Sequence, residues 1–278
     1  MRGEHVVGDT SRRAADRASN LNGSVPVPVA QSGTGTENMA PGTSIFDPVL
    51  CELIYRWFAP KAGVVLDPFA GGSVRGIVAA RLGLTYVGID LRAEQVAANR
   101  EQGEALAPDN PPTWHHGDSR HLPTLCADLD ADLVFSCPPY ADLERYSDDP
   151  ADLSTLDYPA FIEAYRAIVA AAVARLRANR FACFVVGDVR DKAGFYRNLP
   201  GDTIAAFEDA GATLYNEAIL VTAIGSLPLR VGKQFQSGRK LGKTHQNVLV
   251  FYKGDPKRIR ETFGEVDIET GAPDEDAA

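Results

Sequence analysis

The chain has 278 residues, of which 45% are hydrophobic, enough for one substantial core without requiring a second domain. It contains no apolar run of about 18 residues and no apolar N-terminal stretch of the signal-peptide kind, so we expect a cytoplasmic protein without membrane spans. Its four cysteines lie singly, without the CxxC spacing of structural zinc sites, and we expect reduced thiols and no metal. The sequence indicates no particular oligomeric state.

The formal net charge of −9 is unevenly distributed along the chain. Residues 225–260 contain nine basic side chains and one acidic side chain, whereas residues 264–278 contain six acidic side chains and no basic one. Residues 1–40 are rich in Gly, Ser, Thr, Asn and Ala and lack a sustained apolar period. We therefore predict a disordered segment at 1–40, a catalytic domain at 41–260 and an acidic tail at 261–278.

Apolar periodicity predicts a helix at residues 44–58, with Asp47 as its N-cap and Pro48 in its first position. Its apolar residues fall on one helical face: Phe46, Val49, Leu50, Leu53, Ile54 and Trp57. Further helices are expected at 74–82, 161–176 and 204–210. Strands are expected at 63–66, 84–89, 114–116, 131–135, 181–186, 214–222 and 247–252. This alternation predicts an α/β fold with a doubly wound, mostly parallel sheet, which binds ligands beyond the carboxyl ends of its strands.

Acidic residues and glycines follow the first two strands at a spacing that suits a nucleoside. Asp67 ends the first strand, Gly71 and Gly72 lie in the turn after it, and Asp90 ends the second strand. Glycines let a backbone approach a ligand closely, and a carboxylate about 20 residues further on accepts hydrogen bonds from ribose hydroxyls. The turn lacks the Gly-x-Gly-x-x-Gly order of dinucleotide sites, and glycine also serves such turns for purely structural reasons.

The turn sequence Leu66-Asp67-Pro68-Phe69-Ala70-Gly71-Gly72-Ser73 resembles motif I of the amino-directed DNA methyltransferases, and the chain is similar to stand-alone methylases of bacteria and phages. The resemblance implies a seven-stranded, Rossmann-like sheet and S-adenosylmethionine as cofactor, with this turn at its methionine part. It also implies that Asp90 holds the ribose and Asp118 the adenine amino group. The implied cofactor-binding residues are Phe46, Asp47, Asp67, Pro68, Phe69, Gly71, Gly72, Asp90, Asp118 and Ser119.

The sequence Ser136-Cys137-Pro138-Pro139-Tyr140 follows the fourth strand and resembles the catalytic motif of the same family, in which Asp, Asn or Ser precedes Pro-Pro and an aromatic residue. Two prolines fix the backbone and donate no amide hydrogen, and an aromatic ring stacks on an extruded base. The resemblance implies that the first side chain and the first proline carbonyl accept hydrogen bonds from the target amino group. Catalysis would then rest mainly on positioning.

Cys137 stands where the family has an oxygen acceptor, and sulfur is a weak acceptor. Ser136, the Pro138 carbonyl or a later residue would then supply the missing interaction, or the activity is altered. A covalent role for Cys137 is disfavoured, because C5-cytosine enzymes place the cysteine after a proline, and a packed cysteine is the simpler interpretation. The target therefore stays open between cytosine N4 and adenine N6.

A predicted loop at 225–246, between the last two strands, carries basic side chains and no acidic one: Arg230, Lys233, Arg239, Lys240 and Lys243. Such a loop near the catalytic edge suits a phosphate backbone, so DNA is the expected partner, with a plain soluble loop as the alternative. Its length predicts a short or loosely defined recognition sequence. The rival functions are methylation of RNA or of a protein glutamine, and a non-catalytic DNA-binding module. Residues 187–191, after the fifth strand, also lie at the ligand edge, where an ordinary turn is an equal alternative.

Overall fold

The computed structural model describes residues 45–141, 146–222 and 227–266, and within these ranges it leaves out the side chain of Arg230. The segment at 1–40 and residues 267–278 of the predicted tail lie outside the described residues. Within the described ranges, no helix is both long and apolar enough to cross a membrane. The same ranges contain no cluster of three or more potential metal ligands.

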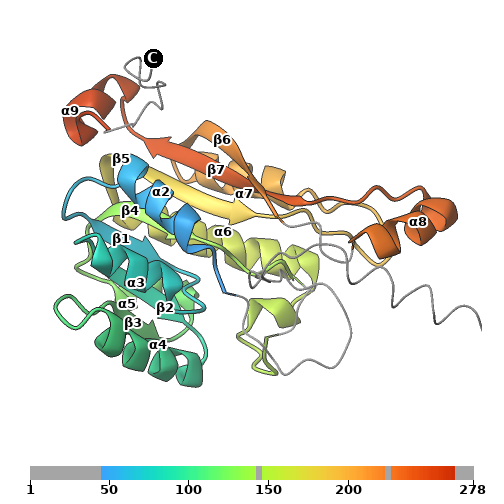
Figure 1. Ribbon diagram of the computed structural model, residues 1–278, viewed down its shortest axis with the longest axis horizontal. Helices are drawn as coiled ribbons and strands as arrows, with labels where there is room; N and C mark the ends of the chain where they lie inside the picture. Colours follow the sequence, from blue (N-terminus) through green and yellow to red (C-terminus); the bar gives the residue numbers. More distant parts are fainter. Residues whose placement is uncertain (1–44, 142–145, 223–226, 267–278) are drawn as a thin grey trace, which may run out of the picture. The chain divides into compact units, whose positions relative to one another are not determined.

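A seven-stranded sheet forms the centre of the molecule, in the order β3-β2-β1-β4-β5-β7-β6 (Figure 1). The strands are β1 (Val64–Asp67), β2 (Thr85–Asp90), β3 (Thr113–His116), β4 (Ala131–Ser136), β5 (Leu176–Val186), β6 (Thr213–Val221) and β7 (His245–Lys253). Strands β1 to β5 run parallel, and β7 is antiparallel to its neighbours β5 and β6. The predicted doubly wound, mostly parallel α/β sheet is confirmed, and the carboxyl ends of β1 to β5 share one edge.

Helices cover both faces of this sheet (Figure 1). One layer consists of α2 (Pro48–Phe58), α3 (Val74–Arg81) and α4 (Ala93–Leu106). The other consists of α5 (Leu122–Leu125), α6 (Tyr158–Arg175) and α7 (Leu199–Asp209). The remaining helical elements are α8 (Leu227–Gly238), α9 (Ile259–Phe263) and the short 3-10 helices η1 (Ser119–His121), η3 (Leu153–Thr155) and η4 (Pro256–Arg258).

The face that α2 buries agrees only in part with the predicted apolar face, of which Phe46, Leu50 and Ile54 pack on the core. Three members of that face are exposed: Val49, Leu53 and Trp57. The core side chains of the helix are those of Cys51, Ile54 and Tyr55. The hydroxyl of Tyr55 donates to the backbone carbonyl of Arg75 on α3 (2.8 Å), and this contact turns the 51–55 face inward.

Four α-helices were not expected from the sequence: α4, α5, α8 and α9. The side of α4 that faces inward carries Val96, Asn99 and Gly103, so it lacks the apolar stripe that marks a helix in a sequence. The prediction of a loop at 225–246 is wrong at residues 227–238, which form α8. This helix contains Pro228 and two glycines, residues that usually indicate a loop.

Several boundaries also move: α6 and α7 begin at Tyr158 and Leu199, and β5 begins at Leu176. At the end of the chain, Phe263 of α9 packs on Phe181 of β5 with ring centroids 5.1 Å apart. The predicted domain boundary at residue 260 therefore falls inside a packed helix.

Candidate active site

The turn after β1, residues 67–72, is called the glycine turn below, and it is organised around the buried carboxylate of Asp67. Its Oδ1 accepts hydrogen bonds from the Ser136 hydroxyl (2.5 Å) and the Phe69 amide (3.1 Å). Its Oδ2 accepts from the Tyr86 hydroxyl (2.7 Å) and from Nε of Arg75 (2.6 Å). With no exposed surface, the Asp67 side chain holds the turn from the inside.

Arg75 was not expected from the sequence, although a charged residue on the inner face of α3 is a signal that could have found it. The residue is 4% exposed, and its guanidinium donates to the carbonyls of Phe69 (2.7 Å) and Ala70 (2.9 Å). Burial alone would lower the pKa of Arg75, but the charge of Asp67 outweighs it and raises the pKa. The ring of Phe46, which lies just before α2, is 4.6 Å from the guanidinium carbon.

The predicted N-cap of α2 is confirmed. Asp47 accepts hydrogen bonds from the amides of Val49 (2.8 Å) and Leu50 (3.2 Å), and Pro48 follows it in the first helical position. This cap fixes the start of α2 and, with it, the position of Phe46 beside Arg75.

Side chains after β2 hold the opposite side of the glycine turn. Asp90 accepts hydrogen bonds from the amides of Gly71 and Arg92, both at 2.9 Å. Asn99 of α4 donates to the carbonyl of Gly71 (2.7 Å), and Gln95 donates to the Asn99 side chain (2.9 Å). Burial raises the pKa of the Asp90 carboxyl, which lies half-buried at the carboxyl edge of the sheet.

The glycines mark the open side of the turn. Gly71 has a φ of +51°, a left-handed conformation that favours glycine. A Cβ atom placed on Gly71 or on Gly72 would meet no other atom within 4 Å, so the space beside this backbone is open to a ligand.

The end of β3 is tied to the same turn. The buried hydroxyl of Ser119 donates to the Pro68 carbonyl (2.5 Å). Asp118 caps η1 through the Arg120 amide (2.8 Å) and pairs with the Arg120 guanidinium. Burial acts to raise the pKa of the Asp118 carboxyl, but the hydrogen bonds and charge of Arg120 outweigh it and lower the pKa. The predicted residues Asp67, Asp90, Asp118 and Ser119 thus meet at one edge.

Ser136 connects the glycine turn to the predicted catalytic sequence. It is completely buried, donates to Asp67 and accepts from the Phe69 amide (3.2 Å). Of the acceptors that the sequence left open, the Ser136 hydroxyl is thus already engaged by Asp67 and Phe69 and has no exposed surface. The connection brings residues 138–140, called the proline corner below, beside the glycine turn.

Tyr140 of the proline corner is held from three sides. The Cys137 sulfur lies 3.7 Å from its hydroxyl, which also accepts from Nε2 of Gln246 at the start of β7 (2.5 Å). Its ring covers Gly187 at the end of β5, where a Cβ would lie 3.6 Å from Cζ. The buried residue Ala141 follows with a φ of +51°, a left-handed backbone conformation that residues other than glycine rarely adopt. No pattern in the sequence singled out Gln246.

The predicted phosphate-binding residues lie near this edge in two environments. Lys233 on α8 and Arg239 just after it are exposed to solvent. Lys240 and Lys243 instead lie against residues 188–197, the turn that follows β5. Figure 1 shows α8 beyond the end of the sheet toward which β5 points.

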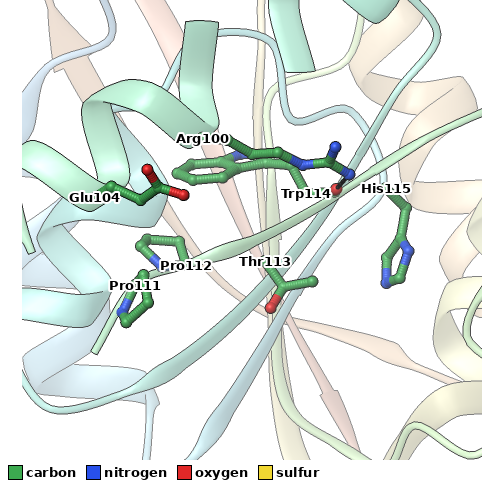
Figure 2. A pocket seen from close by; sticks show the side chains of 7 residues that line it. All are labelled: Arg100, Glu104, Pro111, Pro112, Thr113, Trp114 and His115. Atoms are coloured by element: carbon green, nitrogen blue, oxygen red, sulfur yellow. Dashed lines mark hydrogen bonds between the residues drawn. The ribbon is translucent and has the colours of Figure 1, made fainter. Parts of the chain in front are cut away.

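A cavity of about 290 Å³ lies elsewhere, at the beginning of β3 (Figure 2). Arg100 and Glu104 reach it from α4, and Pro111 and Pro112 border it from the loop before the strand. Because it lies at the amino end of β3, it does not include the residues predicted for the cofactor.

No protein-family model and no curated protein matches this sequence. Solved structures do match the fold. TrmN from Thermus thermophilus is similar with a TM-score of 0.51 and 18% identity, over 77% of this chain and 50% of TrmN. A candidate sarcosine dimethylglycine methyltransferase from Galdieria sulphuraria has a TM-score of 0.51 and 15% identity, over 74% of this chain and 84% of that protein. The [4+2]-cyclase SpnF has a TM-score of 0.51 and 12% identity, over 74% of this chain and 81% of SpnF.

These likenesses establish the fold. The chain has the α/β, Rossmann-like fold of S-adenosylmethionine-dependent methyltransferases, as the resemblance of its motifs implied. It spans about half the length of TrmN. A cyclase has the same fold, so the fold alone does not determine the reaction.

Proposed function

We propose that the chain is an S-adenosylmethionine-dependent methyltransferase that methylates an exocyclic amino group, cytosine N4 or adenine N6, of a base flipped out of DNA. The observation that carries this proposal is the hydrogen bond between Ser136 and Asp67 (2.5 Å), which holds the end of β4, two residues before the proline corner, against the glycine turn. A methyl donor bound at the turn and an amino nitrogen bound at the corner would lie side by side.

The residues around the glycine turn fit the cofactor. S-adenosylmethionine supplies a methyl group on a positively charged sulfur. The open backbone at Gly71 and Gly72 leaves room for the methionine part, next to Phe46. Asp90 accepts two backbone hydrogen bonds and has lone pairs left for ribose hydroxyls, and Asp118 lies at the neighbouring strand end for the adenine amino group.

The proline corner suits a neutral amino nitrogen. Pro138 and Pro139 donate no amide hydrogen, so backbone carbonyls face the site without competing donors. Since Ser136 is buried and the Cys137 sulfur accepts weakly, the Pro138 carbonyl is the proposed acceptor for the amino group. The ring of Tyr140 is the proposed stacking surface for the base. These groups act by positioning, without a nucleophile on the protein.

The basic residues after β6 support a nucleic-acid substrate. Residues 227–244 contain no acidic residue, and Lys233 and Arg239 are exposed there. Neutralised phosphates release counterions, which makes such a stretch a favourable site for a nucleic-acid backbone. A glutamine side chain in a protein substrate offers no comparable charge, so DNA is preferred over protein.

The experiment is a transfer assay with the full chain and methyl-labelled S-adenosylmethionine on duplex DNA of mixed sequence. Nucleosides from the digested DNA are then separated by mass spectrometry, and we expect labelled N4-methylcytosine or N6-methyladenine. Parallel reactions contain RNA of the same sequence and a glutamine-containing protein. Calorimetric titration with S-adenosylmethionine measures cofactor binding independently.

Matched variants assign the result to the site. Tyr140→Leu should bind the cofactor normally and lose transfer, whereas Trp57→Ala, an exposed aromatic residue on α2, should change neither. A chain that does not bind S-adenosylmethionine contradicts the proposal completely. Label found only in RNA or protein contradicts the DNA substrate, and cofactor and DNA binding without transfer indicates an inactive binding module.

A further inference from the structure

The segment after β5 folds into a closed turn, residues 188–197, called the aromatic turn below. The Asp191 amide donates to the Phe195 carbonyl (2.8 Å), and the Asp191 carboxylate accepts from the Phe195 amide (2.8 Å). Gly194, with a φ of +96°, donates to the Asp191 carbonyl (3.0 Å), and Arg190 donates to the Gly194 carbonyl (2.8 Å). These bonds fix the tip of the turn before any ligand binds.

Two aromatic side chains project from the aromatic turn. Phe195 is 72% exposed, and no ring or cation among the described residues packs on it. Tyr196 is 47% exposed, with the guanidinium carbon of Arg190 3.8 Å and the ammonium of Lys243 5.9 Å from its ring centre. A large exposed ring on a fixed backbone is typical of a contact surface, because little conformational freedom is lost when a partner binds.

Basic residues lie along the aromatic turn. Lys243 forms an ion pair with Asp188, and the ammonium of Lys240 lies over Gly194, where a Cβ would be only 2.8 Å away. The two acidic residues of the turn are engaged within this surface: Asp188 by Lys243, and Asp191 by the backbone of the turn itself. The surface therefore presents aromatic rings and an excess of positive charge.

This surface is continuous with the proline corner. Gly187, which lies under the Tyr140 ring, directly precedes the aromatic turn. Gln246, which binds the Tyr140 hydroxyl, closely follows Lys243 in the chain. Both neighbours of Tyr140 therefore lead to the same surface, so the nucleotides next to a base held at Tyr140 would reach it.

We infer that the aromatic turn and residues 239–243 bind the nucleic-acid strand that carries the flipped base, an assignment that rests on the DNA substrate proposed above. Phe195 stacks on a base beside the flipped one, and Lys240 and Lys243 contact phosphates of the same strand. Rings flanked by cations match alternating bases and phosphates, whereas a protein partner would require no such alternation. The sequence left residues 187–191 open between a place at the ligand edge and an ordinary turn, and Phe195 lies beyond that stretch.

The test compares Phe195→Ala with Trp57→Ala, because Trp57 is also an exposed aromatic residue (45%) but lies at the end of α2 that precedes β1, at the opposite edge of the sheet. Fluorescence anisotropy measures binding to labelled single-stranded and duplex DNA of mixed sequence. We expect Phe195→Ala to weaken binding roughly fivefold to a hundredfold, the range for loss of one stacked base. Trp57→Ala should bind as the unmodified chain does.

Salt dependence separates stacking from charge. Phe195→Ala should leave the slope of log affinity against log salt unchanged, because no charge is removed. Lys240→Gln should reduce that slope by about one unit and weaken binding to all sequences alike. Single-stranded DNA containing 2-aminopurine adds a direct readout, since its fluorescence should be quenched by the unmodified chain and less by Phe195→Ala.

Calorimetry with S-adenosylmethionine distinguishes failure of this inference from failure of the proposed function. Normal cofactor affinity in Phe195→Ala together with weakened DNA binding supports the surface. Unchanged DNA binding in Phe195→Ala overturns it, even where methyl transfer to DNA is observed. Weakened DNA binding in Phe195→Ala supports the proposed DNA-binding surface even where the chain transfers no methyl group. In that case only the proposed methyl transfer is contradicted.

Discussion

The glycine turn and α8 lie near the same edge of the sheet and are built in opposite ways. The turn is fixed by buried polar groups. Asp67 accepts four hydrogen bonds, and Arg75 donates to two backbone carbonyls of the turn. The described side chains of α8 are partly or fully exposed, and those of Lys233 and Phe235 face solvent. One region is rigid before a ligand arrives, and the other has little packing that would hold it.

This difference suits the two ligands proposed. A small cofactor must be held in one position relative to the acceptor nitrogen, and a preorganised site loses little entropy when it binds. A long nucleic acid is bound mainly through its phosphates, for which an exposed basic helix is sufficient. The aromatic turn combines the two designs, since its backbone is fixed at Asp191 and Phe195 while its side chains are exposed.

The largest expected effect comes from removing Arg75, the buried cation that pairs with Asp67 and holds the glycine turn. Arg75→Met leaves the Asp67 carboxylate buried without its ionic partner, and such a loss destabilises proteins by about 3–5 kcal/mol. Urea unfolding followed by circular dichroism should show this decrease in the free energy of unfolding.

The matched control is Arg166→Met, which removes an arginine from the exposed ion pair with Asp209. Exposed ion pairs contribute about 0–1 kcal/mol to the free energy of unfolding, so this variant should be nearly as stable as the unmodified chain. Equal effects of the two substitutions would mean that the glycine turn is no more dependent on its charges than the surface.

The cofactor affinity provides a second test of the preorganised region. Asp90→Asn removes a charged acceptor from the ribose hydroxyls and should weaken S-adenosylmethionine binding roughly tenfold to a hundredfold, as expected for hydrogen bonds to charged groups. Burial raises the pKa of the Asp90 carboxyl, so it is protonated at a higher pH than an ordinary aspartate. Affinity should therefore be complete above this pKa and fall as the pH decreases through it.

Titration calorimetry across the acidic range measures this dependence. In Asp90→Asn the affinity for S-adenosylmethionine should not fall as the pH decreases, because this variant lacks the carboxyl that titrates. A fall of the same size in both proteins would assign the pH dependence to another group.

The sheet and the positions of most site residues followed from the sequence, because strand ends and glycine turns are marked by local patterns. Asp67, Asp90 and Tyr140 each come directly after an apolar run or its turn, and parallel strands bring such ends together. Contacts between distant residues carry no such mark. Gln246 acts through Tyr140, which lies 106 residues earlier in the chain and becomes its neighbour only on folding.

Roles were less predictable than positions. The sequence left Ser136 as one of several possible acceptors for the target amino group, and only the three-dimensional structure shows its hydroxyl between Asp67 and Phe69. α8 was missed because Pro228 and glycines are ordinarily signs of a loop, although Leu227, Val231 and Phe235 follow a helical period.

Cys137 tests whether the proline corner works by positioning alone. Cys137→Ala removes a weak acceptor and should leave methyl transfer within about twofold of the unmodified chain. Cys137→Ser restores an oxygen acceptor and should raise the rate roughly fivefold, as expected for one ordinary hydrogen bond. Single-turnover transfer to DNA is the measurement, with cofactor affinity as the control, and complete loss of transfer in Cys137→Ala would instead indicate a covalent role.

The smallest expected effect concerns the balance of charge at the aromatic turn, whose backbone is fixed and whose basic side chains are partly exposed. Asp188 pairs with Lys243 at the edge of the aromatic turn, so Lys243 must leave this carboxylate to neutralise a phosphate. Asp188→Asn should therefore strengthen DNA binding a few-fold and steepen its dependence on salt by up to about one unit. Anisotropy titrations at several salt concentrations measure both quantities. A stabilising role for the ion pair predicts the reverse, since its loss would then loosen the aromatic turn and weaken binding. Asp191 forms no ion pair with a basic side chain among the residues that the structure describes, so Asp191→Asn separates the effect of charge near the surface from release of Lys243.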